Sequence, residues 1–258
     1  MSLVRVLVAL AGIAVLAACT SPQQQRISRE ARMAERVLER EGSVGDPGRV
    51  AATDFAFAKM AREQGTWTAF REYAAGNAVM DAPSGFAPAA EVLAGRADPA
   101  EPLRWAPTDI WSSCDGTLAV SRGRFQRANG LVGDYVTVWE LQSNGDYKWI
   151  YDTGTPDDPQ PAPRQEIEIP EDENVIVVEE MVSINGQVAS CPAANATIPG
   201  ADYSYDGGVT GSDSAAEDDT LSYSRQLSPD GSRRVVVGWW RDGNWAEVVD
   251  LAIPADAE

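Results

Sequence analysis

The chain has 258 residues with 21 Lys and Arg, 39 Asp and Glu, three Cys and no His, which gives a formal net charge of −18. This acidity argues against a nucleic-acid partner, because phosphate backbones are bound by clustered Lys and Arg. The absence of His excludes Ser-His-Asp and Cys-His catalysis and His-ligated zinc. A hydrophobic content of 44% with eight Trp is sufficient for a packed core, so global disorder is excluded as well.

The N-terminus predicts an export signal. Arg5 precedes an apolar stretch, 6–15, that is too short for an ordinary membrane span. The stretch ends in Leu16-Ala17-Ala18-Cys19, which resembles the lipobox of bacterial lipoproteins. This resemblance implies removal of residues 1–18 and lipidation of Cys19, and several acyl chains on one residue anchor a protein stably. Thr20, in place of Asp, resembles the pattern of outer-membrane lipoproteins that face the periplasm. The alternative is an ordinary secretory signal with a chance Cys.

The lipobox leaves two cysteines, Cys114 and Cys191, in an oxidising compartment. An even number of cysteines in such a compartment predicts one disulfide. Two free buried thiols are the alternative. A catalytic Cys is disfavoured because the chain has no His to activate it.

The first half of the chain changes from helical to strand periodicity. Residues 19–48 predict a lipid anchor, a polar spacer and a charged tether helix over 26–41. Two further helices, a short strand and a helical turn are expected next, at 50–64, 67–75, 78–80 and 89–93. A period of two then predicts strands, with a hairpin turn at Asn144-Gly145, over 105–112, 117–126, 134–142 and 147–152.

The second half contains long acidic stretches. Residues 152–181 hold ten acidic side chains against one basic one and five Pro, which predicts a linker leading into a strand over 175–183. Asn185-Gly186 predicts another hairpin turn, and the Gly/Ser/Asp-rich residues 201–219 predict a mobile loop. An antiparallel meander is expected after them, with strands over 221–227, 235–240 and 245–253.

Two motifs resemble the SnoaL-like domains of the nuclear transport factor 2-like superfamily. Residues 52–57 with 78–80 are similar to the helical opening of these domains, and 135–139 with 144–154 to their closing hairpin. The resemblance covers residues 49–156 and implies an α+β fold, a cone of helices packed in a curved antiparallel sheet with a pocket at its open end. Residues 157–258 are then an acidic linker and a β-rich C-terminal extension.

The same resemblance limits the possible chemistry. The superfamily includes ketosteroid isomerase-like enzymes, polyketide cyclases and dehydratases, and also many members without catalysis. Without His, a catalytic base must be a carboxylate. Asp109 is the best guess for such a base because the neighbouring Trp111 is of the kind that raises a carboxyl pKa; a plain hydrogen bond at a strand end is the alternative, and it is preferred. The other choices in the matched region are Asp54, Asp81 and Asp152, with Tyr73 and Tyr135 as hydrogen-bond donors. For Asp54 the alternative is a structural carboxylate near the start of a helix, where the helix dipole favours a negative charge.

A hydrophobic pocket in the cone is expected to be lined by Tyr73, Trp105, Asp109, Trp111, Arg122, Tyr135, Trp139 and Trp149. Alternatively, the aromatic side chains fill the core and Arg122 contacts the chain's own acidic segments. No metal site and no cofactor are expected. The leading hypothesis is a non-catalytic lipoprotein that binds a small apolar ligand or an envelope protein. The alternatives are a His-independent isomerase or lyase with an Asp base and a structural envelope protein with a filled cone.

Overall fold

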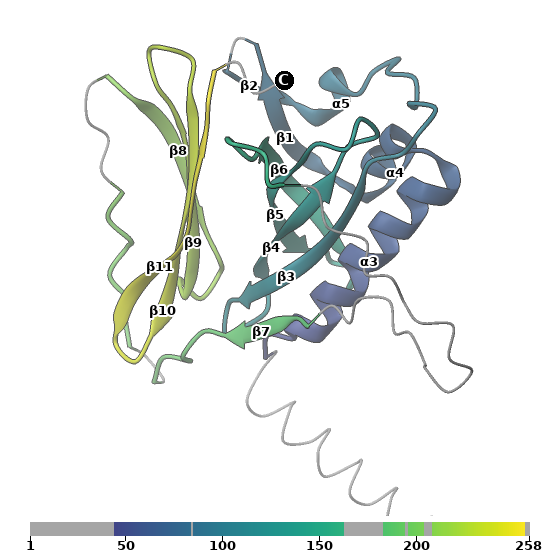
Figure 1. Cartoon of the computed structure of the whole chain (residues 1–258). Coiled ribbons are helices and arrows are strands. Elements are labelled where there is room, and N and C mark those ends of the chain that lie inside the picture. The colour runs from purple at the N-terminus through teal and green to yellow at the C-terminus, as the bar shows by residue number, and fades with distance from the viewer. Residues whose placement is uncertain (1–43, 84, 163–182, 194–195, 204–207, 256–258) are drawn as a thin grey trace, which may run out of the picture. The chain divides into compact units, whose positions relative to one another are not determined.

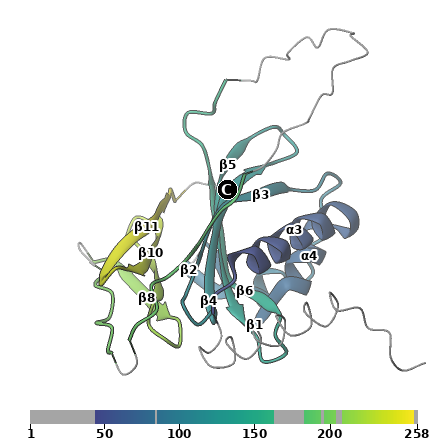
Figure 2. The same cartoon turned by 90° about the horizontal axis from the view of Figure 1, so that it is seen from below.

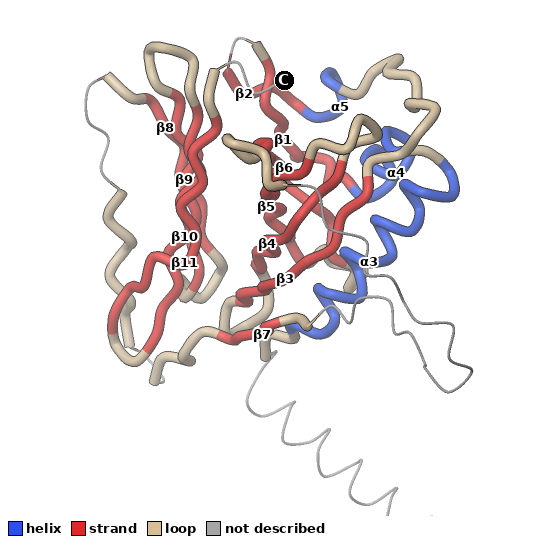
Figure 3. The backbone as a smooth tube through the Cα atoms, in the orientation of Figure 1, coloured by secondary structure: helices blue, strands red, loops and turns tan. Residues whose placement is uncertain are grey.

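The computed structural model describes residues 44–83, 85–162, 183–193, 196–203 and 208–255. The chain from Val44 to Glu258 forms one compact unit. Several expectations lie outside the described residues: the lipobox with Cys19, the spacer, the tether helix over 26–41 and nearly all of the strand over 175–183. The described part is built in three layers, which are a layer of helices, a seven-stranded sheet and a four-stranded sheet (Figures 1 and 3).

Helix α3 spans Pro47–Gln64 and confirms the helix expected over 50–64. It begins three residues earlier than expected, because Asp46 accepts a hydrogen bond from the backbone nitrogen of Arg49 at 3.2 Å and Pro47 occupies the first turn. It ends at Gly65, whose φ of 115° favours glycine.

Helix α4, Thr66–Tyr73, follows at once, and its start is capped from a distant loop. The Asp98 carboxylate accepts hydrogen bonds from the backbone nitrogens of Trp67 and Thr68, at 2.5 and 3.0 Å. Asp98 also accepts a hydrogen bond from the Thr68 hydroxyl, and this bond, together with the two backbone bonds, lowers the pKa of Asp98. The short helix α5, Ala89–Val92, confirms the expected helical turn.

The seven-stranded sheet has the order β2-β1-β6-β5-β4-β3-β7. Neighbouring strands are antiparallel except for two parallel pairs, β1 with β6 and β3 with β7. Its strands are β1 Ala74–Ala82, β2 Gly85–Pro88, β3 Arg104–Ser112, β4 Leu118–Gln126, β5 Val132–Leu141, β6 Tyr147–Pro156 and β7 Asn185–Val188.

The four-stranded sheet is an antiparallel meander of order β11-β10-β9-β8. Figure 2 shows it on one side of the seven-stranded sheet, with the helices on the other side. Its strands are β8 Thr210–Ala215, β9 Leu221–Leu227, β10 Arg233–Arg241 and β11 Asn244–Ile253.

The seven-stranded sheet separates two hydrophobic cores, because successive residues of a strand point to opposite faces. In the helix-side core, Phe57 of α3 packs against the rings of Trp105 and Trp139, with ring centres 4.7 and 6.1 Å apart. In the inter-sheet core, Tyr151 of β6 stacks on Tyr223 of β9 at 6.4 Å. Both faces of this sheet are therefore covered.

The expected fold class, an α+β nuclear transport factor 2-like cone with a β-rich C-terminal extension, is wrong. Of the described residues, 47% lie in strands and 16% in helices, arranged as two sheets and three helices. The C-terminal part accounts for this difference. It builds a second sheet against the first and adds β7 to the edge of the first, so it is not an appendage to a cone.

Two local expectations in the C-terminal half are also wrong, while the hairpin turn at 144–145 and the final meander are confirmed. Asn185-Gly186 does not form a turn but begins β7, parallel to β3. A Cβ on Gly186 would lie 2.8 Å from the Cβ of Pro47, so this glycine permits close approach to the start of α3. The expected loop over 201–219 contains β8, whose six exposed residues pair with β9 through the backbone.

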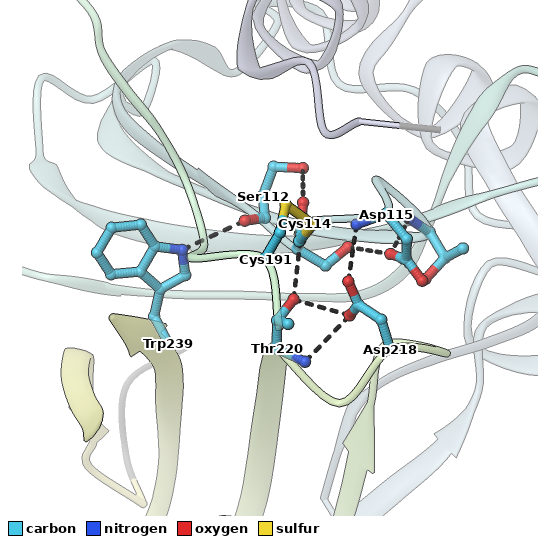
Figure 4. Close-up of a disulfide and its surroundings, with 9 residues drawn as sticks. Ser112, Cys114, Asp115, Cys191, Asp218, Thr220 and Trp239 are labelled. Atoms are coloured by element: carbon cyan, nitrogen blue, oxygen red, sulfur yellow. Dashed lines mark hydrogen bonds between the residues drawn. A yellow bond between two sulfur atoms is a disulfide. The ribbon is translucent and has the colours of Figure 1, made fainter. Parts of the chain in front are cut away.

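The predicted disulfide is confirmed between Cys114, just after β3, and Cys191, just after β7, with Cα atoms 5.1 Å apart. Hydrogen bonds between the two sheets surround it (Figure 4). The backbone nitrogen of Cys114 donates to the Thr220 hydroxyl at 2.8 Å, and the Trp239 indole donates to the carbonyl of Ser112 at 3.2 Å. The bonded cysteines and these contacts fix the C-terminal part to the seven-stranded sheet.

Replacing both cysteines, Cys114→Ser with Cys191→Ser, is expected to lower the free energy of unfolding. The bond joins residues separated by 77 positions in the sequence, for which chain entropy gives about 4.5 kcal/mol. Denaturant unfolding of the full chain measures the loss. Reduction of the wild type should reproduce it, and an unchanged midpoint in both experiments would contradict this role.

Candidate functional site

A cavity of about 1130 Å³ opens beside the helix-side face of the seven-stranded sheet. Helix α4, strands β1 and β3 to β6, and the loop before β3 supply most of its walls, and the β9–β10 turn and the end of β11 reach its mouth. Most of its lining side chains are apolar or aromatic. The aromatic residues that line it are Trp67, Phe70, Trp105, Phe125 and Tyr135.

Asp152 of β6 is a half-buried carboxyl on the cavity floor. It pairs with Thr137 of β5, whose hydroxyl donates to Asp152 Oδ2 at 2.6 Å, and with Met80 of β1. Burial raises the pKa of Asp152 to about 7, with further contributions from the charges of Asp54 and Asp81, while the Thr137 bond acts in the opposite direction. The carboxyl therefore changes charge near neutral pH.

Asp54 lies in the middle of α3 and is wholly buried, so it is not the end-of-helix carboxylate that the sequence allowed. Its Oδ1 accepts a hydrogen bond from the Trp105 indole at 2.9 Å, and its Oδ2 accepts from the hydroxyls of Ser121 and Tyr135 at 2.7 and 2.9 Å. Burial raises the pKa of Asp54, while the three hydrogen bonds act to lower it. The bonds fix the orientation of two cavity side chains, Trp105 and Tyr135.

Glycines in the strands let an aromatic side chain of the cavity lining pack against the sheet. A Cβ on Gly154 would lie 3.2 Å from the Phe125 ring and 3.3 Å from the Cβ of Tyr135. A Cβ on Gly133 would lie 2.5 Å from the same Phe125 ring. These glycines let the aromatic ring lie close to the sheet, which is one reason for glycine inside a strand.

Arginines lie around the mouth of the cavity. The Arg96 guanidinium carbon is 3.9 Å from the centre of the Trp67 ring, and that of Arg127 is 5.8 Å from the Phe125 ring. Arg233 of β10 has a side chain only 11% exposed, and its Nε lies 3.9 Å from an oxygen of Asp81. The four-stranded sheet thus supplies a charge to the cavity wall.

The structure brings together two of the eight expected pocket residues in this cavity, Trp105 and Tyr135. Trp139 and Trp149 are wholly buried in the helix-side core. Tyr73 lines a smaller hollow of about 590 Å³ beside α3.

Asp109, Trp111 and Arg122 lie away from the large cavity. The Asp109 carboxyl accepts bonds from Thr108 and Asn185. Trp111 belongs to the inter-sheet core, and Arg122 forms an ion pair with Asp134 of the neighbouring strand β5 at 3.2 Å. Sequence reasoning preferred Asp109 to Asp152 and did not single out Phe70, Phe125 or the arginines of the mouth for this site.

No family model matches this chain, and no curated protein is similar to it. The resemblance to SnoaL-like domains therefore stays a prediction from the sequence. None of the helices in the described part of the chain has the length and hydrophobicity of a transmembrane span.

Asp152→Asn is expected to stabilise the chain more at pH 8 than at pH 5. The raised pKa of Asp152 means that its protonated form stabilises the folded state at low pH, and that this contribution is lost as the pH rises through about 7. The neutral amide has no such loss, so the melting temperature at pH 8 should rise by about 2–4 °C.

Thermal unfolding at the two pH values measures this difference. Met80→Leu changes an uncharged neighbour on the same floor and should shift the melting temperature equally at both. A gain from Asp152→Asn that is the same at pH 5 and pH 8 would show that the carboxyl does not titrate in this range.

Proposed function

We propose that this chain is a lipid-anchored protein of the bacterial envelope that binds a small amphipathic ligand in the cavity. One observation carries the binding function: an open cavity of about 1130 Å³ is lined mostly by apolar and aromatic side chains, and its floor holds a partly exposed carboxyl. Sites for small molecules are typically concave and mostly apolar, with a few polar groups that orient the ligand. The cavity has this composition.

The arrangement of the walls supports binding over a structural role with a filled interior. Trp139 and Trp149 fill the core beneath α3 and α4, and the cavity persists beside them. Phe125 and Trp105 would contact the apolar body of a ligand, while Asp152 would accept a hydrogen bond from its polar end. Side chains that line an open cavity contribute less to stability than they would in a filled core, because they have fewer packing contacts.

Proton transfer is the second candidate function, favoured by the Asp152 pKa of about 7, which suits a general base at neutral pH. Asp152, rather than Asp109, would be that base, because it is the one that lines the cavity. Tyr135, the phenol that lines the cavity, already donates a hydrogen bond to Asp54 at 2.9 Å, which leaves it poorly placed to polarise a substrate carbonyl. We therefore place binding first.

Two features support the envelope location. The segment ending in Leu16-Ala17-Ala18-Cys19 resembles a lipobox, which implies attachment to the membrane through lipid on Cys19. The bond between Cys114 and Cys191 is of the kind that forms in oxidising compartments such as the periplasm. Membrane lipid and the cavity ligand are the partners proposed.

The cavity is expected to bind the uncharged fluorescent probe N-phenyl-1-naphthylamine with saturable, one-to-one stoichiometry. Met80→Trp places an indole on the floor beside Asp152 and should weaken binding about tenfold or more, because the ring occupies volume that the probe needs. Fluorescence titration of the full chain measures both affinities.

Met60→Trp is the matched control, since Met60 lies on α3 at the smaller hollow and outside the large cavity. It should leave the probe affinity unchanged. Absence of saturable binding to the wild type, or equal weakening by both variants, would refute a ligand site in this cavity.

Cys19→Ala is expected to release the chain from the membrane fraction of its host, because the alanine offers no thiol for lipid. Fractionation and immunoblotting measure the distribution, with Ser21→Ala as a neighbouring control that stays in the membrane fraction. Retention of the Cys19→Ala variant in the membrane would show that the lipobox interpretation is wrong.

A further inference from the structure

The cavity floor carries negative charge that the described part of the chain does not neutralise. Asp54 and Asp81 lie close enough to Asp152 for their charges to act on it. Asp81 has Arg233 at 3.9 Å, and Asp54 accepts hydrogen bonds from three neutral donors. Within the described residues, no Lys or Arg nitrogen lies within 4.0 Å of the Asp152 carboxylate. In the described part of the chain, an ionised Asp152 therefore has no partner of opposite charge within ion-pair distance.

The charged residues that line the whole cavity also include more carboxyls than arginines. The lining contains three arginines, Arg96, Arg127 and Arg233, and four carboxyls, Asp81, Glu101, Asp152 and Asp230. Arg233 also donates a hydrogen bond to the carbonyl of Ala82 and so is already engaged at the mouth. The lining thus has one carboxyl in excess, and Asp152 is the carboxyl on the floor.

The aromatic walls suit a positive charge as well. The face of an aromatic ring attracts cations, and organic ammonium ions are commonly bound among several such rings. Two rings of this lining, Trp67 and Phe125, already have guanidinium groups of the chain close to their centres. Phe70, Trp105 and Tyr135 complete the aromatic surface.

The field of the whole molecule reinforces this preference. A net charge of −18 attracts cations and repels anions before they reach the cavity. A ligand with an anionic head would have to overcome this field.

We propose that the ligand of this cavity is an amphipathic organic cation, an amine or ammonium compound whose charged nitrogen lies against Asp152 and whose apolar body lies among the aromatic side chains. This inference rests on the proposed binding function and specifies the chemical class of its ligand. The cation supplies the missing partner of Asp152, and the rings contact both the charge and the hydrocarbon.

Three naphthyl compounds of similar shape test the proposal: 2-naphthylmethylamine, 2-naphthylmethanol and 2-naphthoate. Isothermal titration of the full chain at pH 8, where a primary ammonium stays protonated, gives the three affinities. The amine should bind about tenfold more tightly than the alcohol, and the naphthoate more weakly than the alcohol.

Asp152→Asn should bring the amine to about the affinity of the alcohol, which itself should bind as it does to the wild type and so reports that the cavity is intact. Asp109→Asn is the matched control, an aspartate on a strand outside the cavity, and should keep the preference for the amine.

The possible outcomes separate the two proposals. If the neutral probe and all three compounds fail to bind, the proposed binding function is refuted, and this inference is refuted with it. If the alcohol or the naphthoate binds the wild type as tightly as the amine, the cationic ligand is refuted while the binding function stands. A preference for the amine that survives Asp152→Asn would also refute the assigned role of this carboxyl.

Discussion

The buried carboxyl of Asp54 is the interaction on which the arrangement of the helix, the sheet and the cavity depends. Among the described residues it is the charged side chain that is wholly buried, and burial of a charge is costly unless hydrogen bonds compensate. Its three donors come from β3, β4 and β5. Helix α3 therefore cannot slide along the sheet without leaving this carboxyl unsatisfied. The same bonds hold Trp105 and Tyr135 against the cavity.

The second constraint is that the seven-stranded sheet is apolar on both faces and must be covered on both. The helices bury one face, and the four-stranded sheet buries the other through residues such as Tyr223 and Trp239. The same C-terminal part contributes Arg233 and the end of β11 to the mouth of the cavity. The cavity is therefore a product of all three layers, and the bond between Cys114 and Cys191 helps to keep them together.

Local periodicity was sufficient to predict much of the secondary structure, and compartment chemistry was sufficient to predict the disulfide. The three strands of the final meander were predicted, but β8 was missed because it has the composition of a loop and all six of its residues are exposed. The site was harder to predict. Asp109 was preferred because Trp111 is near it in the sequence. The carboxyl that lines the cavity is instead determined by the pairing of β6 with β5 and β1. This pairing between strands distant in the sequence places Asp152 on the cavity floor, and it cannot be inferred from the spacing of residues along the chain.

The central claim is that Asp152 receives the polar end of a ligand inside this cavity. A carboxyl ¹³C NMR titration of Asp152, with and without saturating 2-naphthylmethylamine, tests it most directly. Without the amine, the pKa of Asp152 should be about 7. With the amine bound, the adjacent positive charge should lower this pKa by about one unit or more. A titration of Asp152 that the bound amine leaves unchanged would contradict the account.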